Sequence, residues 1–386
     1  MPETMEPYRI EISDEDLRDL HERLHRTRWP ERETVDDWSQ GVPLAYLQEL
    51  CGYWAGGYDW RATERRLNAL PQFRTEIDGV GIHVVHVRSP HSHALPLLLT
   101  NGWPGSIVEY LKVIGPLTDP AAHGGDAADA FHVVCPTLPG YGFSDKPAGP
   151  GWGVDRIAGA WAELMSRLGY DRYAAAGSDW GTSVTTRLGL RAPESVVGIH
   201  LMPPLAPPDP ATFGNLTDSE RAALESLREA DEWGSGYSMQ QSTRPQTVGY
   251  GLVDSPVALC AWIVEKFWAW TDWDTHLDEI VTRDELLANV TLYWLSRTGA
   301  SSARLYWESI RQVNEWIAGS AGEPVTVPTG CTIFPKELQR PSRRWAEKRF
   351  PNILHWGETA RGGHFAALEQ PELFVDELRS FFRLVR

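Results

Sequence analysis

Gly177-Ser178-Asp179-Trp180-Gly181 is the stretch of sequence that decides the fold. It follows a run of mostly small residues at 172–176, typical of a buried strand, and it precedes a helical stretch that stops at Pro193. Glycines two residues before and two residues after a central residue let a strand turn sharply into a helix while holding that residue in a strained conformation. The pattern therefore predicts a nucleophile elbow with Asp179 in the nucleophile position.

Strand and helix patterns alternate on both sides of this turn. An amphipathic helix is expected at 155–168, and a last helix at 371–384. Alternation of this kind implies a mostly parallel sheet with helices on both faces, an α/β fold. Further strands are expected at 82–88, 95–100, 131–135, 198–202, 325–334 and 352–356.

The same pattern divides the chain into four segments. Residues 1–74 form a charged, Trp-rich N-terminal extension with short helices, and residues 75–204 hold the first part of the α/β core. Residues 205–324 are helical and aromatic, as expected of a cap that covers an active site. The strand pattern resumes in residues 325–386, the second part of the core.

Composition excludes several classes of protein. The 386 residues carry 36 Lys+Arg and 52 Asp+Glu, a net charge of −16, which repels phosphate backbones and anionic lipids. We therefore expect neither nucleic acid nor membrane partners. The first ten residues lack the pattern of a signal peptide, and the four cysteines lie far apart without metal or redox spacing. These features predict a cytoplasmic protein with neither a metal nor a cofactor.

One zinc-like motif is present near the start. His21-Glu-Arg-Leu-His25 matches H-E-x-x-H on a predicted helix. Arginines surround the motif and would oppose a divalent cation, and no third ligand is evident. A solvated amphipathic helix is the interpretation that we adopt.

Two candidate partners for Asp179 follow the cap. Glu337 lies after an expected strand and His364 lies in a loop before the last helix, so that nucleophile, acid and histidine come in the order of the α/β-hydrolase fold. Upstream, the loop 101–105 can offer the Trp103 N–H, and the Trp180 N–H can complete an oxyanion hole. Two simpler interpretations stay open: Asp179 as a helix N-cap, and Glu337 as a solvated charge, with Glu323 or a neighbour in its place.

The chain resembles the epoxide hydrolases of the microsomal type across residues 6–386. Motifs at both ends of the chain and in the cap carry this resemblance: Thr27-Arg-Trp-Pro30, Asn101-Gly-Trp-Pro-Gly105, Gly177-Ser-Asp-Trp-Gly181, Ser235-Gly-Tyr237, Asp254-Ser-Pro256, Ser301-Ser302 before Tyr306, and Arg361-Gly-Gly-His-Phe365. It is also compatible with an actinobacterial enzyme of secondary metabolism, including enediyne antibiotic biosynthesis, and with a role in detoxification.

The resemblance assigns roles to residues. It makes Asp179 the nucleophile, His364 the base and Glu337 the acid that orients it, while Tyr237 and Tyr306 grip the epoxide oxygen. The backbone N–H groups of Trp103 and Trp180 are expected to form the oxyanion hole, and Trp103, Pro104 and Trp180 to contact the substrate, with the Trp103-Pro104 bond cis. The family usually has histidine where this chain has Asn101.

The chemistry requires these residue types. A carboxylate is already ionised at neutral pH and can attack an epoxide carbon without a base, and two phenols can protonate the oxygen that is released. Water activated by histidine then cleaves the ester to give a vicinal diol. The partners are thus a small-molecule epoxide and water, and the family resemblance also suggests a homodimer. A hydrophobic, aryl-bearing or bulky epoxide is expected from the Trp-rich cap: Trp262, Trp268, Trp270, Trp273, Trp294 and Trp307.

Two alternative functions remain at this point. A haloalkane dehalogenase also uses an aspartate followed by tryptophan, but paired tyrosines have no task with a halide. A ligand receptor could keep the fold without turnover. Substrate identity, regiochemistry and enantioselectivity are not readable from the sequence.

Overall fold

The computed structural model describes residues 5–317 and 322–386. Within these residues nine strands form one sheet in the order β1-β2-β3-β5-β4-β6-β7-β8-β9. The strands are β1 (Glu6–Pro7), β2 (Gln72–Ile77), β3 (Val80–Val87), β4 (Leu95–Thr100), β5 (Phe131–Pro136), β6 (Tyr173–Ser178), β7 (Val196–Met202), β8 (Thr329–Ile333) and β9 (Ile353–Glu358). The pairs from β5 through β4 to β9 are parallel, and β1, β2 and β3 join the sheet antiparallel.

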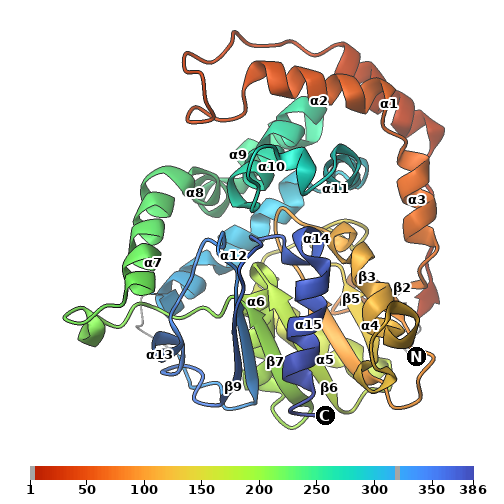
Figure 1. Ribbon diagram of the computed structural model, residues 1–386. Helices are drawn as coiled ribbons and strands as arrows, with labels where there is room; N and C mark the ends of the chain where they lie inside the picture. The colour runs from red at the N-terminus through yellow and green to blue at the C-terminus, as the bar shows by residue number, and fades with distance from the viewer. Residues whose placement is uncertain (1–4, 318–321) are drawn as a thin grey trace.

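Helices make up most of the remaining regular structure (Figure 1). Before β7 the helices are α1 (Asp14–His25), α2 (Leu44–Gly56), α3 (Trp60–Asn68), α4 (Ile114–Thr118), α5 (Val154–Arg167) and α6 (Trp180–Arg191). After it come α7 (Asp218–Glu229), α8 (Gly236–Thr243), α9 (Pro245–Asp254), α10 (Pro256–Trp270), α11 (Arg283–Leu295), α12 (Gly299–Ile317), α13 (Arg343–Ala346), α14 (Ala366–Glu369) and α15 (Pro371–Phe382).

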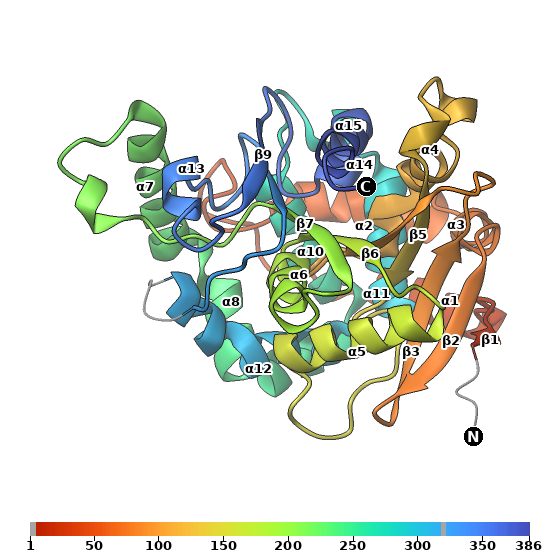
Figure 2. The ribbon, with the colours of Figure 1, turned by 90° about the horizontal axis from the view of Figure 1, so that it is seen from below.

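Helices cover both faces of the sheet (Figure 2). Helices α5 and α6 pack on one face, while α4 and α15 pack on the other. Helix α5 forms because Ile157, Trp161 and Leu164 recur at helical spacing, and all three are buried in the core. The expected mostly parallel sheet with helices on both faces is confirmed.

Helices α7–α12, which we call the cap helices, come between β7 and β8 in the chain. In Figure 1 they lie over the end of the sheet at which β6 passes into α6. The carboxyl ends of parallel strands meet at this edge, where ligands bind in open α/β sheets. The fold therefore places Asp179 beneath the cap helices.

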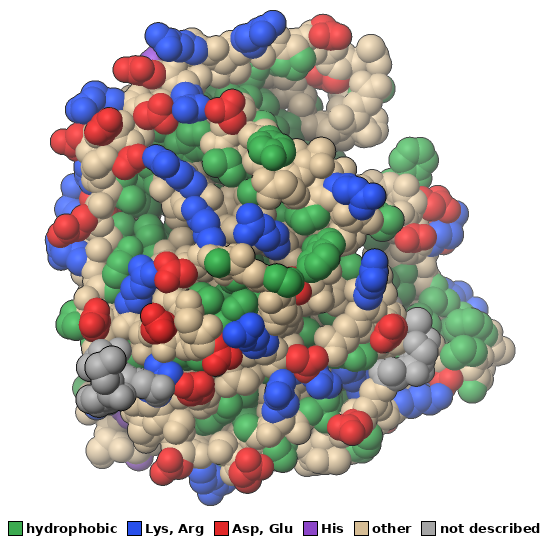
Figure 3. Space-filling model, turned by 180° about the vertical axis from the view of Figure 1, so that it is seen from behind, with side chains coloured by type: hydrophobic (Ala, Val, Ile, Leu, Met, Phe, Trp, Pro, Cys, Tyr) green, Lys and Arg blue, Asp and Glu red, His purple; other side chains and the backbone are tan. Residues whose placement is uncertain are grey.

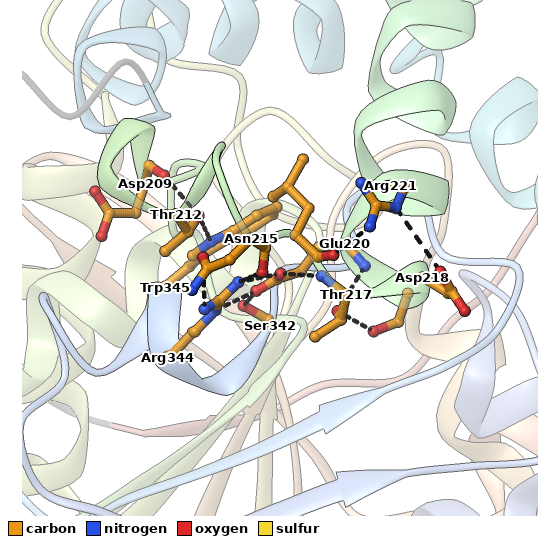
Figure 4. Close-up of polar contacts among 12 residues, drawn as sticks. Asp209, Thr212, Asn215, Thr217, Asp218, Glu220, Arg221, Ser342, Arg344 and Trp345 are labelled. Atoms are coloured by element: carbon orange, nitrogen blue, oxygen red, sulfur yellow. Dashed lines mark hydrogen bonds and ion pairs between the residues drawn. The ribbon is translucent and has the colours of Figure 1, made fainter.

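The first cap helix is fixed to the core by a buried carboxylate. Glu220 is 1% exposed, and its side chain accepts hydrogen bonds from Arg344 Nε at 2.6 Å and from Ser342 Oγ at 2.7 Å (Figure 4). The guanidinium of Arg344 lowers the pKa of Glu220 to about 2. Nearby, Trp345 Nε1 donates to Thr212 Oγ1 at 3.0 Å. Helix α7 is thus attached to the segment that contains α13.

The N-terminal helices lie on the outer side of the cap helices (Figure 1). The rings of Trp38 and Trp268 stack with centroids 4.6 Å apart. Arg23 Nη1 lies 3.1 Å from Asp254 Oδ1 at the end of α9, and Tyr53 Oη donates to Asp284 Oδ1 of α11 at 2.8 Å. Helices α9, α10 and α11 therefore pack between the N-terminal extension and the core.

The division of the chain into four segments stays a prediction. Residues 1–4 and 318–321, which fall in its first and third segments, lie outside the described residues. Acidic and basic side chains are interspersed on the face seen in Figure 3. Within the described part of the chain, no single helix has the length and apolar character needed to cross a membrane. Helices α9 and α10 meet that test only as a pair bent by 115°.

Candidate active site

Asp179 sits in a strained turn between β6 and α6. Its φ is 52° and its ψ is −126°, a conformation that an L residue rarely adopts. The flanking glycines are required by space: a Cβ on Gly177 would lie 2.1 Å from the carbonyl oxygen of Gly181, and one on Gly181 would lie 1.8 Å from that of Thr100. No side chain could occupy either position without moving the backbone. This is the sharp turn that the sequence pattern predicts.

His364 and Glu337 lie beside this carboxylate. His364 Nε2 is 3.4 Å from Asp179 Oδ2, and His364 Nδ1 is 2.8 Å from Glu337 Oε1. Glu337 Oε1 also accepts a hydrogen bond from the Leu338 N–H at 2.7 Å, which fixes its orientation. The structure thus brings together three residues that are far apart in the sequence. The outermost two, Asp179 and His364, are separated by 185 positions.

Asp179 is the most accessible of the three. Its side chain is 17% exposed, against 5% for His364 and 4% for Glu337. A small molecule can therefore reach the carboxylate while the histidine and the glutamate stay enclosed.

The loop after β4 supplies a backbone donor to the carboxylate. The Trp103 N–H donates to Asp179 Oδ1 at 2.8 Å, and the Trp103-Pro104 bond is cis as expected. A Cβ on Gly102 would lie 1.9 Å from the same oxygen, so only glycine allows this approach. The predicted second donor is the N–H of Trp180, the first residue of α6, and its part in the site stays a prediction.

Aromatic rings enclose the space above Asp179. Tyr237 stacks on Trp103 with ring centroids 5.1 Å apart, and Tyr306 meets Trp180 edge to face at 4.8 Å. The two phenols share a side-chain hydrogen bond, and their ring centroids are 5.8 Å apart. Burial, with the nearby charge of Asp179, raises the pKa of both phenols, so both keep their protons at neutral pH. Trp270 adds a further wall against Tyr237 at 5.3 Å.

Two carboxylates compete with burial to set the charge of His364. Burial lowers the pKa of the imidazole, but the charges of Glu337 and Asp179 and their hydrogen bonds raise it more, and the net pKa lies well above its ordinary value. The two carboxylates thus favour the protonated form of the imidazole in the free enzyme.

Asn101 has a defined partner at the position where the family usually has histidine. Its Nδ2 donates to Glu109 Oε1 at 3.1 Å, within the segment η1 (Ile107–Lys112). Glu109 is 5% exposed, and burial raises its pKa to about 7 although the hydrogen bond from Asn101 and the charge of His364 oppose the shift. An asparagine is a neutral donor, so Glu109 has no cationic partner at this position.

The cap helices hold both loops of the site. The His364 N–H donates to the Trp270 carbonyl at the end of α10 at 2.9 Å. Glu369 accepts from the N–H groups of Asp272 and Phe365, each at 2.8 Å, and burial raises its pKa to about 7. On the opposite side, Asn289 Nδ2 donates to the Pro104 carbonyl at 2.8 Å. The base loop and the oxyanion loop are thus both fixed by the cap helices.

The cap tryptophans, whose orientation the sequence does not decide, lie in different surroundings. Trp270 meets His364 and Tyr237, but Trp268 stacks on Trp38 of the N-terminal extension and Trp307 is exposed. Trp273 donates its indole N–H to the Trp268 carbonyl at 2.7 Å. Trp268 packs between layers because the N-terminal extension covers the cap at this point, which the sequence pattern of the cap does not reveal.

Sequence reasoning named Asp179 together with His364, Glu337, Tyr237, Tyr306, Trp103, Pro104 and Trp180, and the structure gathers these residues around the carboxylate of Asp179. It missed Glu109, Asn289, Lys266 and Glu369. A signal existed for Lys266, the single basic residue in the apolar helix Pro256–Trp270. The others depend on contacts between distant segments.

Comparisons with known proteins identify the family of this chain. Residues 5–110 match the family model described as epoxide hydrolase N terminus, and residues 96–230 match that of the alpha/beta hydrolase fold. A protein of Stigmatella aurantiaca named "Putative epoxide hydrolase" is 53% identical over 98% of this chain and 85% of its own length. Epoxide hydrolase 1 of Sus scrofa is 36% identical over 99% and 89%.

Solved structures show the same likeness. The Aspergillus niger epoxide hydrolase superposes with a TM-score of 0.88 and 30% identity, covering 100% of this chain and 97% of that one. The juvenile hormone epoxide hydrolase of the silkworm Bombyx mori gives a TM-score of 0.89 and 29% identity, covering 100% and 96%. Both similarities extend over the N-terminal extension, the core and the cap helices.

Proposed function

The chain belongs to the epoxide hydrolases, on the α/β-hydrolase fold, and from this premise we propose that it opens its substrate through a covalent ester on Asp179. The observation that carries the proposal is the environment of one carboxylate. Oδ1 accepts the Trp103 N–H at 2.8 Å, while Oδ2 faces His364 Nε2 at 3.4 Å. The two oxygens therefore have different tasks.

In the first step Oδ2 attacks an epoxide carbon. The carboxylate needs no base, because it is ionised at neutral pH. The bond from that carbon to the ring oxygen breaks, and the oxygen receives a proton from the Tyr237 and Tyr306 pair. The raised pKa of both phenols keeps this proton available at neutral pH. General acids of this kind contribute about 10²–10⁴-fold to such steps.

Formation of the ester changes the charge around His364. Asp179 becomes neutral, and one of the two carboxylates that raise the pKa of His364 is lost. The imidazole then gives up its proton more readily, the tyrosinate left by ring opening takes up that proton, and the neutral imidazole can act as a base. The alkylated enzyme thus creates the base that its next step requires, and Glu337, bound to Nδ1 at 2.8 Å, keeps the Nε2 side free for water.

In the second step water loses a proton to His364 Nε2 and attacks Asp179 Cγ. Negative charge then develops on Oδ1, which the Trp103 N–H already contacts and which the Trp180 N–H is proposed to contact as well. Collapse of the tetrahedral intermediate breaks the bond from Cγ to the product oxygen. That oxygen takes the proton from His364 and leaves as the second hydroxyl of a vicinal diol. The proton that remains on the carboxyl of Asp179 passes to His364, which restores the starting charges of both groups.

The substrate that we propose is a hydrophobic epoxide, aryl-bearing or bulky. Support comes from the rings of Trp103, Trp180 and Trp270 around Asp179, which offer apolar contact on several sides. Epoxide and water suffice for the reaction, without a metal or a redox cofactor. A homodimer, a cytoplasmic location and a place in secondary metabolism, antibiotic biosynthesis or detoxification stay predictions.

The test is to trap the ester. With His364→Ala, styrene oxide should still alkylate Asp179 but the ester should not be hydrolysed, so the mass of one substrate appears on the peptide that contains Asp179. The matched control is His355→Ala, which removes a different histidine that binds a glutamate at 2.7 Å, and which should turn over without accumulating adduct. An unlabelled Asp179 peptide in the His364 variant would refute the covalent mechanism.

A further inference from the structure

Lys266 is a buried cation that the mechanism does not use. It lies in α10 among apolar residues and is only 5% exposed. Its Nζ stands 4.4 Å from the ring centroid of Tyr237 and 5.6 Å from that of Trp270. A cation over an aromatic face at this distance is attracted by the electrons of the ring.

The ion pair of Lys266 does not explain its position. Glu265 Oε2 lies 2.6 Å from Nζ, but the Glu265 side chain is 34% exposed whereas that of Lys266 is 6% exposed. An ion pair at the surface would leave both groups in water, and burying an ammonium group costs free energy that one partly exposed carboxylate does not fully recover. The lysine extends inward, toward the phenol of the proposed acid.

The surroundings of Tyr237 otherwise oppose its ionisation. Burial is the main cause of its raised pKa, and the charges of Asp179, Glu265 and Glu337 add to the effect. Such a phenol holds its proton well but transfers it with difficulty. Two features oppose this shift: the hydrogen bond from Tyr306 lowers the pKa, and the positive charge of Lys266 against the ring favours negative charge on the phenol oxygen.

We propose that Lys266 is a positioning residue for ring opening: it orients Tyr237 through its ring face and stabilises the negative charge that develops on the phenol oxygen as the epoxide takes the proton. The inference rests on the proposed role of Tyr237. Lys266 does not contact the reacting atoms and acts only through that tyrosine. The second step, in which His364 activates water, does not involve it.

The first measurement is the single-turnover rate of alkylation, followed separately from ester hydrolysis. Lys266→Met removes the charge and keeps an apolar chain of similar length, and it should slow alkylation about tenfold while leaving hydrolysis of the ester unchanged. Lys266→Arg keeps a cation and should restore most of the rate. Glu265→Gln removes the negative partner, so alkylation should proceed at the wild-type rate or faster.

The Glu265 variant separates this role from a structural one. If the ion pair only stabilises α10, both Lys266→Met and Glu265→Gln should lower the melting temperature and the rate together. Equal losses of rate in the two variants would overturn the proposal, and so would a Lys266→Met enzyme that alkylates at the wild-type rate.

A double-mutant cycle with Tyr237→Phe gives the sharper test. Phenylalanine keeps the ring that Lys266 contacts but has no proton to transfer. In the Tyr237→Phe background, Lys266→Met should therefore no longer slow alkylation, although it should still cost stability. A loss of rate that persists in that background would contradict the inference. If Tyr237→Phe by itself leaves alkylation at the wild-type rate, the proposed acid role of Tyr237 is wrong. This outcome is distinct from the one that contradicts only the positioning role of Lys266.

Discussion

Tyr293 donates its phenolic hydrogen to the backbone carbonyl of Gly105 at 2.8 Å. Tyr293 belongs to the cap helix α11, whereas Gly105 ends the core loop whose Trp103 N–H contacts Asp179. One turn earlier in the same helix, Asn289 binds the neighbouring carbonyl of Pro104. The oxyanion loop is therefore held from the cap side by two side chains of one helix, and the orientation of the nucleophile depends on the placement of α11.

Replacing Tyr293 by phenylalanine should loosen this loop. A lost hydrogen bond to a buried carbonyl costs about 0.5–1.5 kcal/mol, and we expect alkylation to slow about 3- to 10-fold. The control is Tyr53→Phe, which removes a hydrogen bond of the same length to Asp284. This residue also belongs to α11, but its partner Tyr53 lies in the N-terminal helix α2 and not in the oxyanion loop. Single-turnover kinetics should show the loss for Tyr293 only; equal effects of the two variants would contradict the role of the loop.

The two cap tyrosines should act together on ring opening. Each single variant, Tyr237→Phe or Tyr306→Phe, should lower the alkylation rate by about 10- to 100-fold, because the other phenol still binds the oxygen. The double variant should lose about 10³-fold or more and accumulate no ester. Rapid-quench mass analysis of the Asp179 peptide measures both. Near-native alkylation in the double variant would remove the tyrosines from the mechanism.

Gly102 should tolerate no side chain. The Cβ of Gly102→Ala would lie 1.9 Å from Asp179 Oδ1 and must displace the carboxylate or the loop. A displacement of about 1 Å at a reacting group costs about 10²-fold in rate, so alkylation should fall by at least that factor. Gly159→Ala in α5 is the control, since a Cβ there meets no atom within 4 Å. The prediction fails if both variants alkylate at the same rate.

Glu109 should make stability depend on pH. Its folded pKa of about 7 lies above its ordinary 4.5, so between these values the folded protein binds more protons than the unfolded one. Stability due to this group therefore falls as pH rises from 4.5 to 7, and it stays lower above 7. Glu109→Gln removes the dependence. The melting temperature of the variant minus that of the wild type should therefore be about 2–5 °C larger at pH 8 than at pH 5.

The groups around Glu109 include the uncharged amide of Asn101, the ionisable side chains of His364 and Asp179, and the buried phenols of Tyr110 and Tyr293. Glu22→Gln, at an exposed position on α1, serves as the control and should shift the melting temperature equally at both pH values. The same shift at both pH values for Glu109→Gln would show that its carboxyl is not held protonated by the fold.

The sequence predicts the core of the site because local rules determine it. The glycines at 177 and 181 specify the turn through sterics, and the order of Asp179, Glu337 and His364 places each at a strand end or loop on the same edge of the sheet. Ser13 likewise predicts the start of α1, where its side chain accepts from the Asp16 N–H. These inferences need only neighbouring residues and the period of the pattern.

The parts that sequence reasoning missed depend on packing between distant segments. Asn289 binds a carbonyl 185 positions away, and nothing near it in the chain marks it as part of the site. The sequence does not decide which cap tryptophans face the pocket, and Trp268 in fact packs on Trp38, because the N-terminal extension provides a second apolar surface. Periodicity shows that a helix has a buried face, but it does not show which of two layers buries that face.

The placement of α1 and α2 outside the cap helices has a consequence for protein engineering. Because Arg23, Trp38 and Tyr53 each contact a cap residue, the cap must match two independent surfaces at once. A chimera that borrows α7–α12 from a relative to alter substrate choice would meet a foreign partner on its outer side. Such grafts should fold well only when residues 5–58 are transferred with them.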